Sequence, residues 1–296
     1  MAIEIRPGVI EDAAVVTALN QELFPYLAKP EEQFRHELRR AIEDPARAIF
    51  AAESDGRLIG WAATGAATWR NVPGAYHLAL FVHTGHRGQG IGSRLLAAVD
   101  AFLADQGAIE VEALPNEEGL PFAVNRGYQP FSEMRFAGVD LRELPAEPER
   151  PQGIELVPLF ELDADAVFAA YRESGQDIPE TPVEATPEWF RQVVWESPSV
   201  AREFSFAAVD GDRVVCCTIS LNSGTGLWTD MTGTVRSHRG RGLARMVKWA
   251  ALRAAADAGL TAAYTANNEG NRPMLAINEW FGYRQVGNHT VVRRKH

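Results

Sequence analysis

Two glycine-rich stretches contain the residues best suited to chemistry in this sequence. HRGQGIG begins at His86 and HRGRGLA begins at His238, and each places an arginine beside two or three glycines. Each stretch follows an apolar run and precedes an amphipathic helical pattern. Glycine lets the backbone N–H groups at a helix start approach a bulky anion, and arginine adds charge-assisted hydrogen bonds. The two stretches therefore predict sites for a phosphate or pyrophosphate group.

Two common nucleotide-binding motifs do not fit these stretches. The dinucleotide fingerprint G-x-G-x-x-G requires a glycine where Ser93 stands, and the Walker loop requires a lysine that neither stretch has. A tight strand-to-helix turn that binds no ligand is the structural alternative.

The sequence repeats itself at a spacing of about 150 residues, which is the length of a whole domain. The arginines of the two loops, the stretches IEIRPG and IELVPL, and Asn116 and Asn267 all recur at about this spacing. Between the halves, ELPAEPERPQG has the proline and charge content of a stiff linker. We predict domains at residues 1–145 and 154–296, joined by a proline-rich linker at 146–153.

Each half predicts the same order of elements. A short strand is followed by two helices, three strands, the glycine loop, a long helix, a strand, a short helix and final strands. The first loop lies between a strand at 75–82 and a helix at 91–106, and the second between a strand at 226–235 and a helix at 243–258. The fold class is α/β (α+β), with two domains that each have a mixed twisted sheet flanked by helices.

Composition excludes several classes of function. Of 296 residues, 46% are hydrophobic, and the net charge of −10 comes without a basic stripe, which argues against nucleic-acid binding. No apolar run is long enough to span a membrane, and the start does not read as a signal peptide. The adjacent Cys216 and Cys217 predict buried thiols, which favours a cytoplasmic location. The histidines and cysteines have no metal-ligand spacing, so no metal is expected.

The two loops and their surroundings resemble the GNAT N-acetyltransferase superfamily. The superfamily's acetyl-CoA loop has the pattern [RQ]-x-x-G-x-[GA], which Arg87 and Arg239 each open. TANNEGNRPMLAINEWFGY, after the second loop, is similar to the segment that follows in many members. The resemblance implies acetyl-CoA as cofactor and direct transfer of the acetyl group to a small-molecule amine. A monomer or homodimer that binds neither nucleic acid nor membrane is expected.

The resemblance also implies which residues contact coenzyme A: a strand backbone, the loop and the asparagines that follow in each half. In the first half these residues are Leu80, Phe81, Val82, Arg87, Gly88, Gln89, Gly90, Ile91, Gly92, Ser93 and Asn116. In the second half they are Gly233, Thr234, Val235, Arg239, Gly240, Arg241, Gly242, Leu243, Ala244, Asn267 and Asn271.

Candidate catalytic residues follow from the same resemblance. A strand N–H, from Val82 or Val235, is expected to stabilise the oxyanion. The family's tyrosine acid is absent from both halves, because Ala123 and Asn278 occupy its positions. Asn278 is kept as a candidate for that position.

Several side chains are candidates for the general base. Asp230, on the strand before the second loop, is the preferred one. In the first half His77, Glu110 and Glu112 are the alternatives, although a buried histidine or a solvent-facing pair of glutamates is the simpler interpretation.

The sequence favours the C-terminal half as the catalytic one. That half has the fuller asparagine-rich segment, whereas Pro121 interrupts the short helix of the first half. Three alternatives stay open: a CoA-binding regulatory or structural protein without turnover, an acyltransferase that uses another acyl-CoA, and an aminoglycoside-modifying enzyme.

Overall fold

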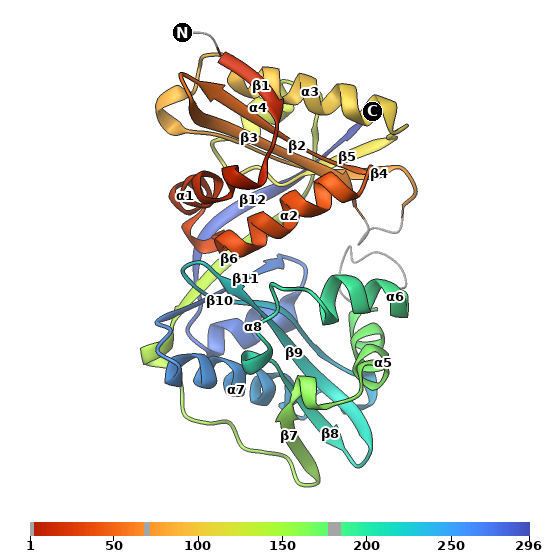
Figure 1. The fold of residues 1–296 in the computed structure, drawn as a ribbon. Coiled ribbons are helices and arrows are strands. Elements are labelled where there is room, and N and C mark those ends of the chain that lie inside the picture. The colour runs from red at the N-terminus through yellow and green to blue at the C-terminus, as the bar shows by residue number, and fades with distance from the viewer. Residues whose placement is uncertain (1–2, 68–71, 177–184) are drawn as a thin grey trace. The chain divides into compact units, whose positions relative to one another are not determined.

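The chain forms two compact units in a computed structural model that describes residues 3–67, 72–176 and 185–296. Unit 1 comprises residues 1–133 and 288–296, and unit 2 comprises residues 134–287. Each unit contains one mixed sheet with helices packed on it (Figure 1).

Unit 1 has six strands in the order β1-β2-β3-β4-β5-β12, in which only β4 and β5 run parallel. The elements of the first half are β1 (Ile3–Pro7), α1 (Ala13–Leu23), α2 (Glu31–Glu43), β2 (Arg47–Ser54), β3 (Arg57–Ala66), β4 (Ala75–Val82), α3 (Ile91–Asp105), β5 (Glu110–Ala113), α4 (Leu120–Val124) and β6 (Gln129–Asp140).

Two apolar clusters cover the two faces of this sheet, because successive strand residues point to opposite sides. On one face α3 packs through Leu95 and Val99 against residues such as Ala62. On the other face α1 and α2 pack against Trp61, the residue before Ala62 in β3. Figure 1 shows α3 on one side of the strands and α1 and α2 on the other.

Unit 2 repeats this plan with the order β6-β11-β10-β9-β8-β7, and here β10 and β11 are the parallel pair. The elements of the second half are β7 (Ile154–Pro158), α5 (Ala164–Gly175), α6 (Pro187–Trp189) continued by a π-helix (Phe190–Trp195), β8 (Phe206–Asp210), β9 (Arg213–Ser223), β10 (Gly226–Thr234), α7 (Leu243–Asp257), β11 (Ala262–Asn268), α8 (Arg272–Trp280) and β12 (Arg284–Lys295).

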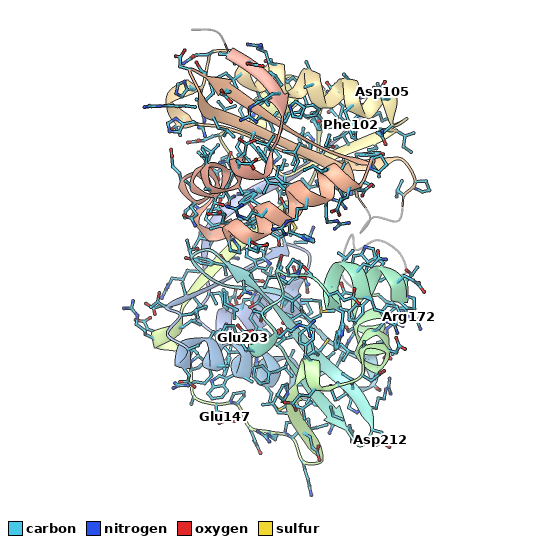
Figure 2. All side chains as sticks on the ribbon, viewed as in Figure 1. Phe102, Asp105, Glu147, Arg172, Glu203 and Asp212 are labelled. Atoms are coloured by element: carbon cyan, nitrogen blue, oxygen red, sulfur yellow. The ribbon has the colours of Figure 1, made fainter. Side chains whose placement is uncertain are left out.

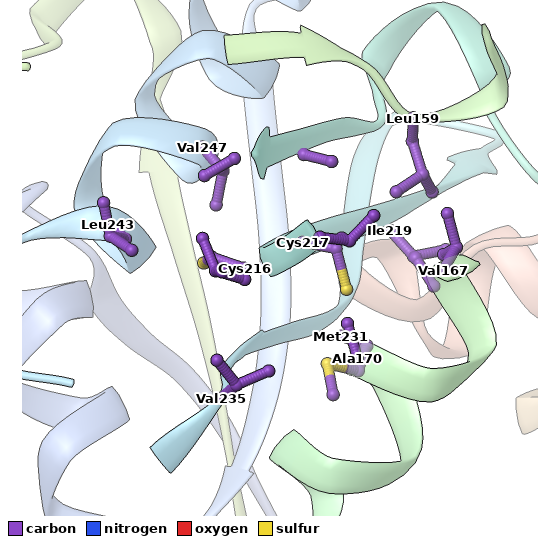
Figure 3. Packing of buried hydrophobic residues seen from close by; sticks show 14 of the residues in the cluster. Leu159, Val167, Ala170, Cys216, Cys217, Ile219, Met231, Val235, Leu243 and Val247 are labelled. Carbon is purple, nitrogen blue, oxygen red and sulfur yellow. The ribbon is translucent and has the colours of Figure 1, made fainter. Parts of the chain in front are cut away.

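The core of unit 2 contains both cysteines as free thiols. Figure 3 shows Cys216 beside Val247 of α7 and Cys217 beside Val167 of α5, on opposite sides of β9. Because neighbouring strand residues point apart, the two sulfur atoms cannot face each other for a bridge. Charged side chains such as Arg172 and Asp212 point away from this core (Figure 2).

The units exchange their last strands. Residues 134–140 of β6 pair antiparallel with β11 of the second half, and Val292–Lys295 of β12 pair antiparallel with β5 of the first half. The chain therefore leaves unit 1 within β6 and returns to it within β12. The contiguous domains predicted at 1–145 and 154–296 differ from the observed units by this exchange, because the predicted boundary follows the linker composition whereas strand pairing decides the units.

The exchanged strand should contribute directly to the stability of unit 1. Val292 is fully buried in the apolar cluster between α3 and the sheet of unit 1. We expect Val292→Ala to lower the free energy of unfolding by about 2 kcal/mol, through lost burial and a cavity. Val286→Ala, in the same strand but 43% exposed, is the control and should cost under about 0.5 kcal/mol. Denaturant titration combined with hydrogen exchange of β2 and β3 measures both, and equal effects of the two variants would contradict the expectation.

Candidate functional site

The two glycine-rich loops have the same backbone conformation. Gly88 and Gly90 have φ of 75° and 79°, and Gly240 and Gly242 have φ of 76° and 82°. These values lie in the left-handed region that favours glycine. Gly90 and Gly242 directly precede α3 and α7 and provide no side-chain cap, so the first N–H groups of each helix have no intrahelical acceptor. Both helix starts suit an anion.

Each loop arginine is held by the strand that precedes the loop. Arg87 Nε donates to the Val82 carbonyl at 3.3 Å, and Arg239 Nε donates to the Thr234 carbonyl at 3.1 Å. Arg87 also forms an ion pair with Glu118 at 2.6 Å, in which both side chains are well exposed. In each unit the strand carbonyl therefore holds the Nε atom of the arginine, which keeps the guanidinium group beside the loop.

Strands β4 and β5 separate after a short stretch of parallel pairing. Their register ends at Leu78 with Ala113, although β4 continues to Val82. The amide of His83 donates to the Ile59 carbonyl at 2.9 Å. In an antiparallel pair every second residue is hydrogen-bonded to the neighbouring strand, so Phe81 and Ala79 are the residues of β4 that bond β3. By this alternation Leu80 and Val82 direct their N–H and C=O groups away from β3, into the gap. Because Arg87 occupies the Val82 carbonyl, the gap offers the backbone of Leu80 and the amide of Val82 to an extended ligand.

A pocket of about 690 Å³ in unit 1 follows this gap through the sheet. On the α3 face it is lined by Leu80, Val82 and Leu96, and on the α1 and α2 face by Ala63 and Phe81. All residues of the first half that were predicted to contact coenzyme A line the pocket except Gln89, which is exposed. A ligand bound at the glycine loop, on the α3 face, can therefore meet a second ligand on the face covered by α1 and α2.

Side chains that the sequence did not single out shape the loop end of the pocket. The ring of Phe122 lies against Gly92, where a Cβ atom would come within 3.0 Å of it. Arg126 stacks on Phe122 at 3.6 Å from the ring centroid and donates to the Ser93 hydroxyl at 2.5 Å. These contacts place a second guanidinium group near the start of α3. In the sequence Arg126 lies outside the loop motif, so nothing there marks it as a phosphate contact.

Tyr128 also lines the pocket, and its hydroxyl is buried. No hydrogen-bond partner for this hydroxyl exists among the residues that the structure describes. Desolvation by burial raises the pKa of Tyr128 to about 12, so the phenol is protonated at neutral pH. An unpaired buried hydroxyl is costly, and a ligand with an acceptor atom would satisfy it.

The side of the pocket formed by α1 and α2 contains an ion pair, and Asn20 and Gln33 are its polar neighbours. Lys29 Nζ lies 2.8 Å from a carboxylate oxygen of Glu37, and both side chains are partly accessible. Desolvation by burial raises the pKa of the Glu37 carboxyl, but the charge and hydrogen bond of Lys29 outweigh it, so the pKa lies below its usual value. Glu37 is therefore ionised. No motif marked these residues, because Lys29 lies before α2 and Glu37 within it.

The exchanged strand β12 contributes His289 to the pocket wall. His289 Nδ1 lies 3.3 Å from the Leu114 carbonyl, and Nε2 lies 2.7 Å from the Tyr26 hydroxyl. Because a carbonyl only accepts, Nδ1 carries the proton and Nε2 accepts from Tyr26. Desolvation by burial lowers the pKa of His289, which keeps the imidazole neutral at neutral pH. Sequence analysis missed this residue because its position depends on the strand exchange.

In unit 2 a buried polar chain occupies the positions that line the pocket in unit 1. Lys248 of α7 donates to Asn278 Oδ1 at 2.6 Å, and Asn278 Nδ2 donates to Asn267 Oδ1 at 2.7 Å. The repeat aligns these three residues with Leu96, Ala123 and Asn116, all of which line the pocket. Asn278 thus uses both groups of its amide in an internal network, which corrects the expectation that it takes part in the reaction. Asn267 stays a predicted cofactor contact.

Other residues predicted in unit 2 also have internal partners. The Val235 amide, a predicted oxyanion donor, donates to the Val215 carbonyl at 3.0 Å, so the prediction for this amide is wrong. Every second residue of β10 bonds β9, so the amide of Gly233 points towards β9 and the amide of Thr234 points away from β9, to the side of β11. Asn271 caps α8 by accepting from the Met274 amide at 3.4 Å.

The second loop itself keeps its predicted place before α7, with Arg239, Gly240, Arg241, Gly242, Leu243 and Ala244 in sequence. Arg241 Nη1 lies 3.7 Å from a carboxylate oxygen of Asp210. Leu243 is buried in the core. This loop remains a predicted phosphate site.

The candidate bases have different environments. Asp230 lies at an irregularity in the pairing of β10 with β9, where its side chain is exposed, and surrounding protein atoms raise the pKa of its carboxyl by desolvation. Desolvation by burial and the charge of Arg47 lower the pKa of His77 to about 4, so His77 is neutral. Glu112 forms an ion pair with Arg293 of β12 at 2.9 Å.

Within 3–67, 72–176 and 185–296, no three His, Cys, Asp or Glu side chains are grouped so that they could hold a metal ion. None of the helices in these ranges has both the length and the apolarity needed to cross a membrane.

Comparison with known proteins gives one family and several similar folds. Residues 14–128 match the family model described as acetyltransferase (GNAT) family. A comparison with curated proteins finds no match. The structure is similar to a GCN5-related N-acetyltransferase from Sphaerobacter thermophilus, with a TM-score of 0.75, 18% identity and coverage of 99% of this chain and 95% of that one.

A tandem GNAT protein from the clavulanic acid biosynthesis pathway gives a TM-score of 0.78 and 20% identity, over 99% of this chain and 98% of that one. A GCN5-related glucosamine N-acetyltransferase region of a fungal multi-domain β-N-acetylglucosaminidase gives 0.70 and 17% identity, over 99% of this chain and 38% of that one. These likenesses show the fold, and they confirm the predicted pair of GNAT-type domains.

The buried lysine of unit 2 predicts an unusual pH dependence of stability. Desolvation by burial lowers the pKa of Lys248 to about 7 from the 10.5 of a free lysine. Between these values the unfolded chain binds a proton that the folded chain does not, so stability rises with pH by up to about 1.4 kcal/mol per unit. We expect the wild type to gain stability over Lys248→Met between pH 7 and pH 10, as measured by chemical denaturation. The exposed Lys295→Met should follow the wild type, and parallel curves for wild type and Lys248→Met would refute the assignment.

Proposed function

We propose that this chain transfers an acetyl group from acetyl-coenzyme A to a small-molecule amine in unit 1. The match of residues 14–128 to the acetyltransferase (GNAT) family model and the likeness of the fold to a tandem GNAT protein support the proposal. The sequence favours the C-terminal half for this role. The observation that carries the choice of unit 1 is the pocket that joins the first glycine loop, the strand gap and the far face of the sheet.

The fit of unit 1 to coenzyme A rests on its own polar groups. The open amides at the start of α3 and the guanidinium groups of Arg87 and Arg126 suit a pyrophosphate. The backbone of Leu80 in the strand gap suits the amide groups of a pantetheine arm. Tyr128 also lines the pocket, and its buried hydroxyl has no partner among the residues that the structure describes.

In this proposal the residues of unit 1 stabilise charge, donate a proton and exclude water. Coenzyme A, when bound, supplies the acetyl thioester. The Val82 amide, which points into the gap, donates a hydrogen bond to the carbonyl oxygen as charge develops on it. Ala123 stands where the family's tyrosine acid is expected. Tyr128, which is protonated at neutral pH, is the residue of unit 1 that we assign to that role. The apolar walls exclude water from the thioester.

Unit 2 is assigned a structural role in this proposal. Its polar chain from Lys248 through Asn278 to Asn267 occupies the positions that form the pocket wall in unit 1. The loop of unit 2 has a similar geometry, so phosphate binding there stays a prediction. Loss of that binding should affect turnover less than loss of binding in unit 1.

Neutral substitution of the two loop arginines tests this assignment. We expect Arg87→Gln to weaken acetyl-CoA binding by about 10-fold or more, because it removes charge-assisted hydrogen bonds to phosphate. Arg239→Gln, the matched change in unit 2, should alter binding and kcat/KM by less than about 2-fold. Isothermal titration and release of free CoA thiol in the presence of mixed amines give both values. A larger loss for Arg239→Gln would move the site to unit 2, and binding without acetyl transfer to any amine would refute the enzymatic activity.

A further inference from the structure

The acceptor side of the unit 1 pocket has features that select a class of amine. This inference rests on the proposed function of the same site. The wall on the α1 and α2 side is largely apolar, with Phe24, Leu27 and Phe81 partly exposed along it. Asn20 and His289 are its neutral polar members. Lys29 and Glu37 interrupt this wall with two opposite charges 2.8 Å apart.

The two charges are accessible enough to meet a ligand. The Lys29 side chain is 44% exposed and the Glu37 side chain is 28% exposed. Lys29 also lies 5.6 Å from the centroid of the Phe34 ring, and Gln33 donates to the same Glu37 oxygen as Lys29 at 3.1 Å. The position of the pair is thus fixed by its neighbours, whereas its outer surface is open to the pocket.

A simple monocationic amine fits this pair poorly. Its ammonium group would be attracted by Glu37 but repelled by Lys29 at nearly the same distance. A zwitterion, in contrast, can insert so that each of its charges meets the opposite one. An apolar body is needed as well, because the surrounding side chains offer aromatic and aliphatic contacts.

We propose that the acceptor is an apolar α-amino acid whose ammonium group pairs with Glu37 and whose carboxylate pairs with Lys29. Its side chain packs against Phe24, Leu27 and Phe81. In the reaction the ammonium loses one proton to water, the nitrogen forms a bond to the acetyl carbon, and the carbon–sulfur bond of the thioester breaks. The nitrogen then gives up a second proton and one proton is returned to the sulfur, so the products are an N-acetyl amino acid and free coenzyme A.

The charges of the pair also favour release of this product. Acetylation removes the ammonium charge but leaves the carboxylate. Glu37 then has no cation to hold other than Lys29, and its charge repels the anionic product. The ion pair can close again as the product leaves.

The test compares acceptors that differ in one group, with the full-length protein and acetyl-CoA. L-Phenylalanine has both charges, and phenethylamine has the same ring without the carboxylate. We expect L-phenylalanine to have the higher kcat/KM. Lys29→Met should raise KM for L-phenylalanine about 10-fold or more and leave that for phenethylamine unchanged or lower, whereas Glu37→Gln should raise both. Glu32→Gln, which breaks the exposed Arg39–Glu32 pair on the same helix, is the matched control and should change neither.

Several results would overturn the acceptor class. These are equal effects of Lys29→Met on both acceptors, a preference for a polyamine or L-glutamate, or an absence of L-phenylalanine binding to the CoA-loaded protein in calorimetry. If acetyl-CoA still binds in an Arg87-dependent way and another amine is acetylated, the acceptor proposal fails while the proposed function stands. If acetyl-CoA does not bind, the proposed function itself fails.

Discussion

The divergence of β4 from β5 is the feature on which the site in unit 1 depends. A closed parallel pair would satisfy every backbone group of β4 and would seal the sheet. Because the pairing stops at Leu78, the amides of Leu80 and Val82 are directed into the gap and the pocket passes between the two faces. The glycine loop then places a helix start at one end of this opening. The gap therefore determines both where an extended ligand can pair and where a second ligand can reach it.

Duplication gave two copies of this arrangement, and their differences lie in a few side chains. Both copies keep the left-handed glycines and the arginine held by a strand carbonyl. Unit 1 has Leu96 and Ala123 where unit 2 has Lys248 and Asn278. A fully buried lysine requires a hydrogen-bond partner, which Asn278 supplies, and Asn267 in turn holds Asn278. An asparagine-rich segment that resembles a cofactor contact thus stabilises a buried lysine.

Much of the fold could be predicted from the sequence, because local signals specify it. The loops, the helices after them and the repeat follow from glycine spacing and apolar periodicity, and the residues of the first loop do line the pocket. The exchange of β6 and β12 could not be predicted, since both strands have similar patterns and pairing between distant segments leaves no local mark. His289 was missed for that reason. The Lys29–Glu37 pair was missed because a charge on a helix, such as Glu37, usually belongs to a solvated face, and Lys29 lies in the loop before that helix.

The exchange of strands has a consequence for synthesis of the chain. Val292 and His289 are made after every other residue range of unit 1 and after unit 2, yet they complete the sheet that contains β1. Until then the edge of β5 is unpaired in the nascent chain, and an unpaired strand edge readily accepts a strand from another molecule. Two neighbouring nascent chains can therefore trade their C-terminal strands, which gives an intertwined dimer as the natural misfolded product. The sheet of unit 1 can thus acquire its final form only after the whole of unit 2 has been made.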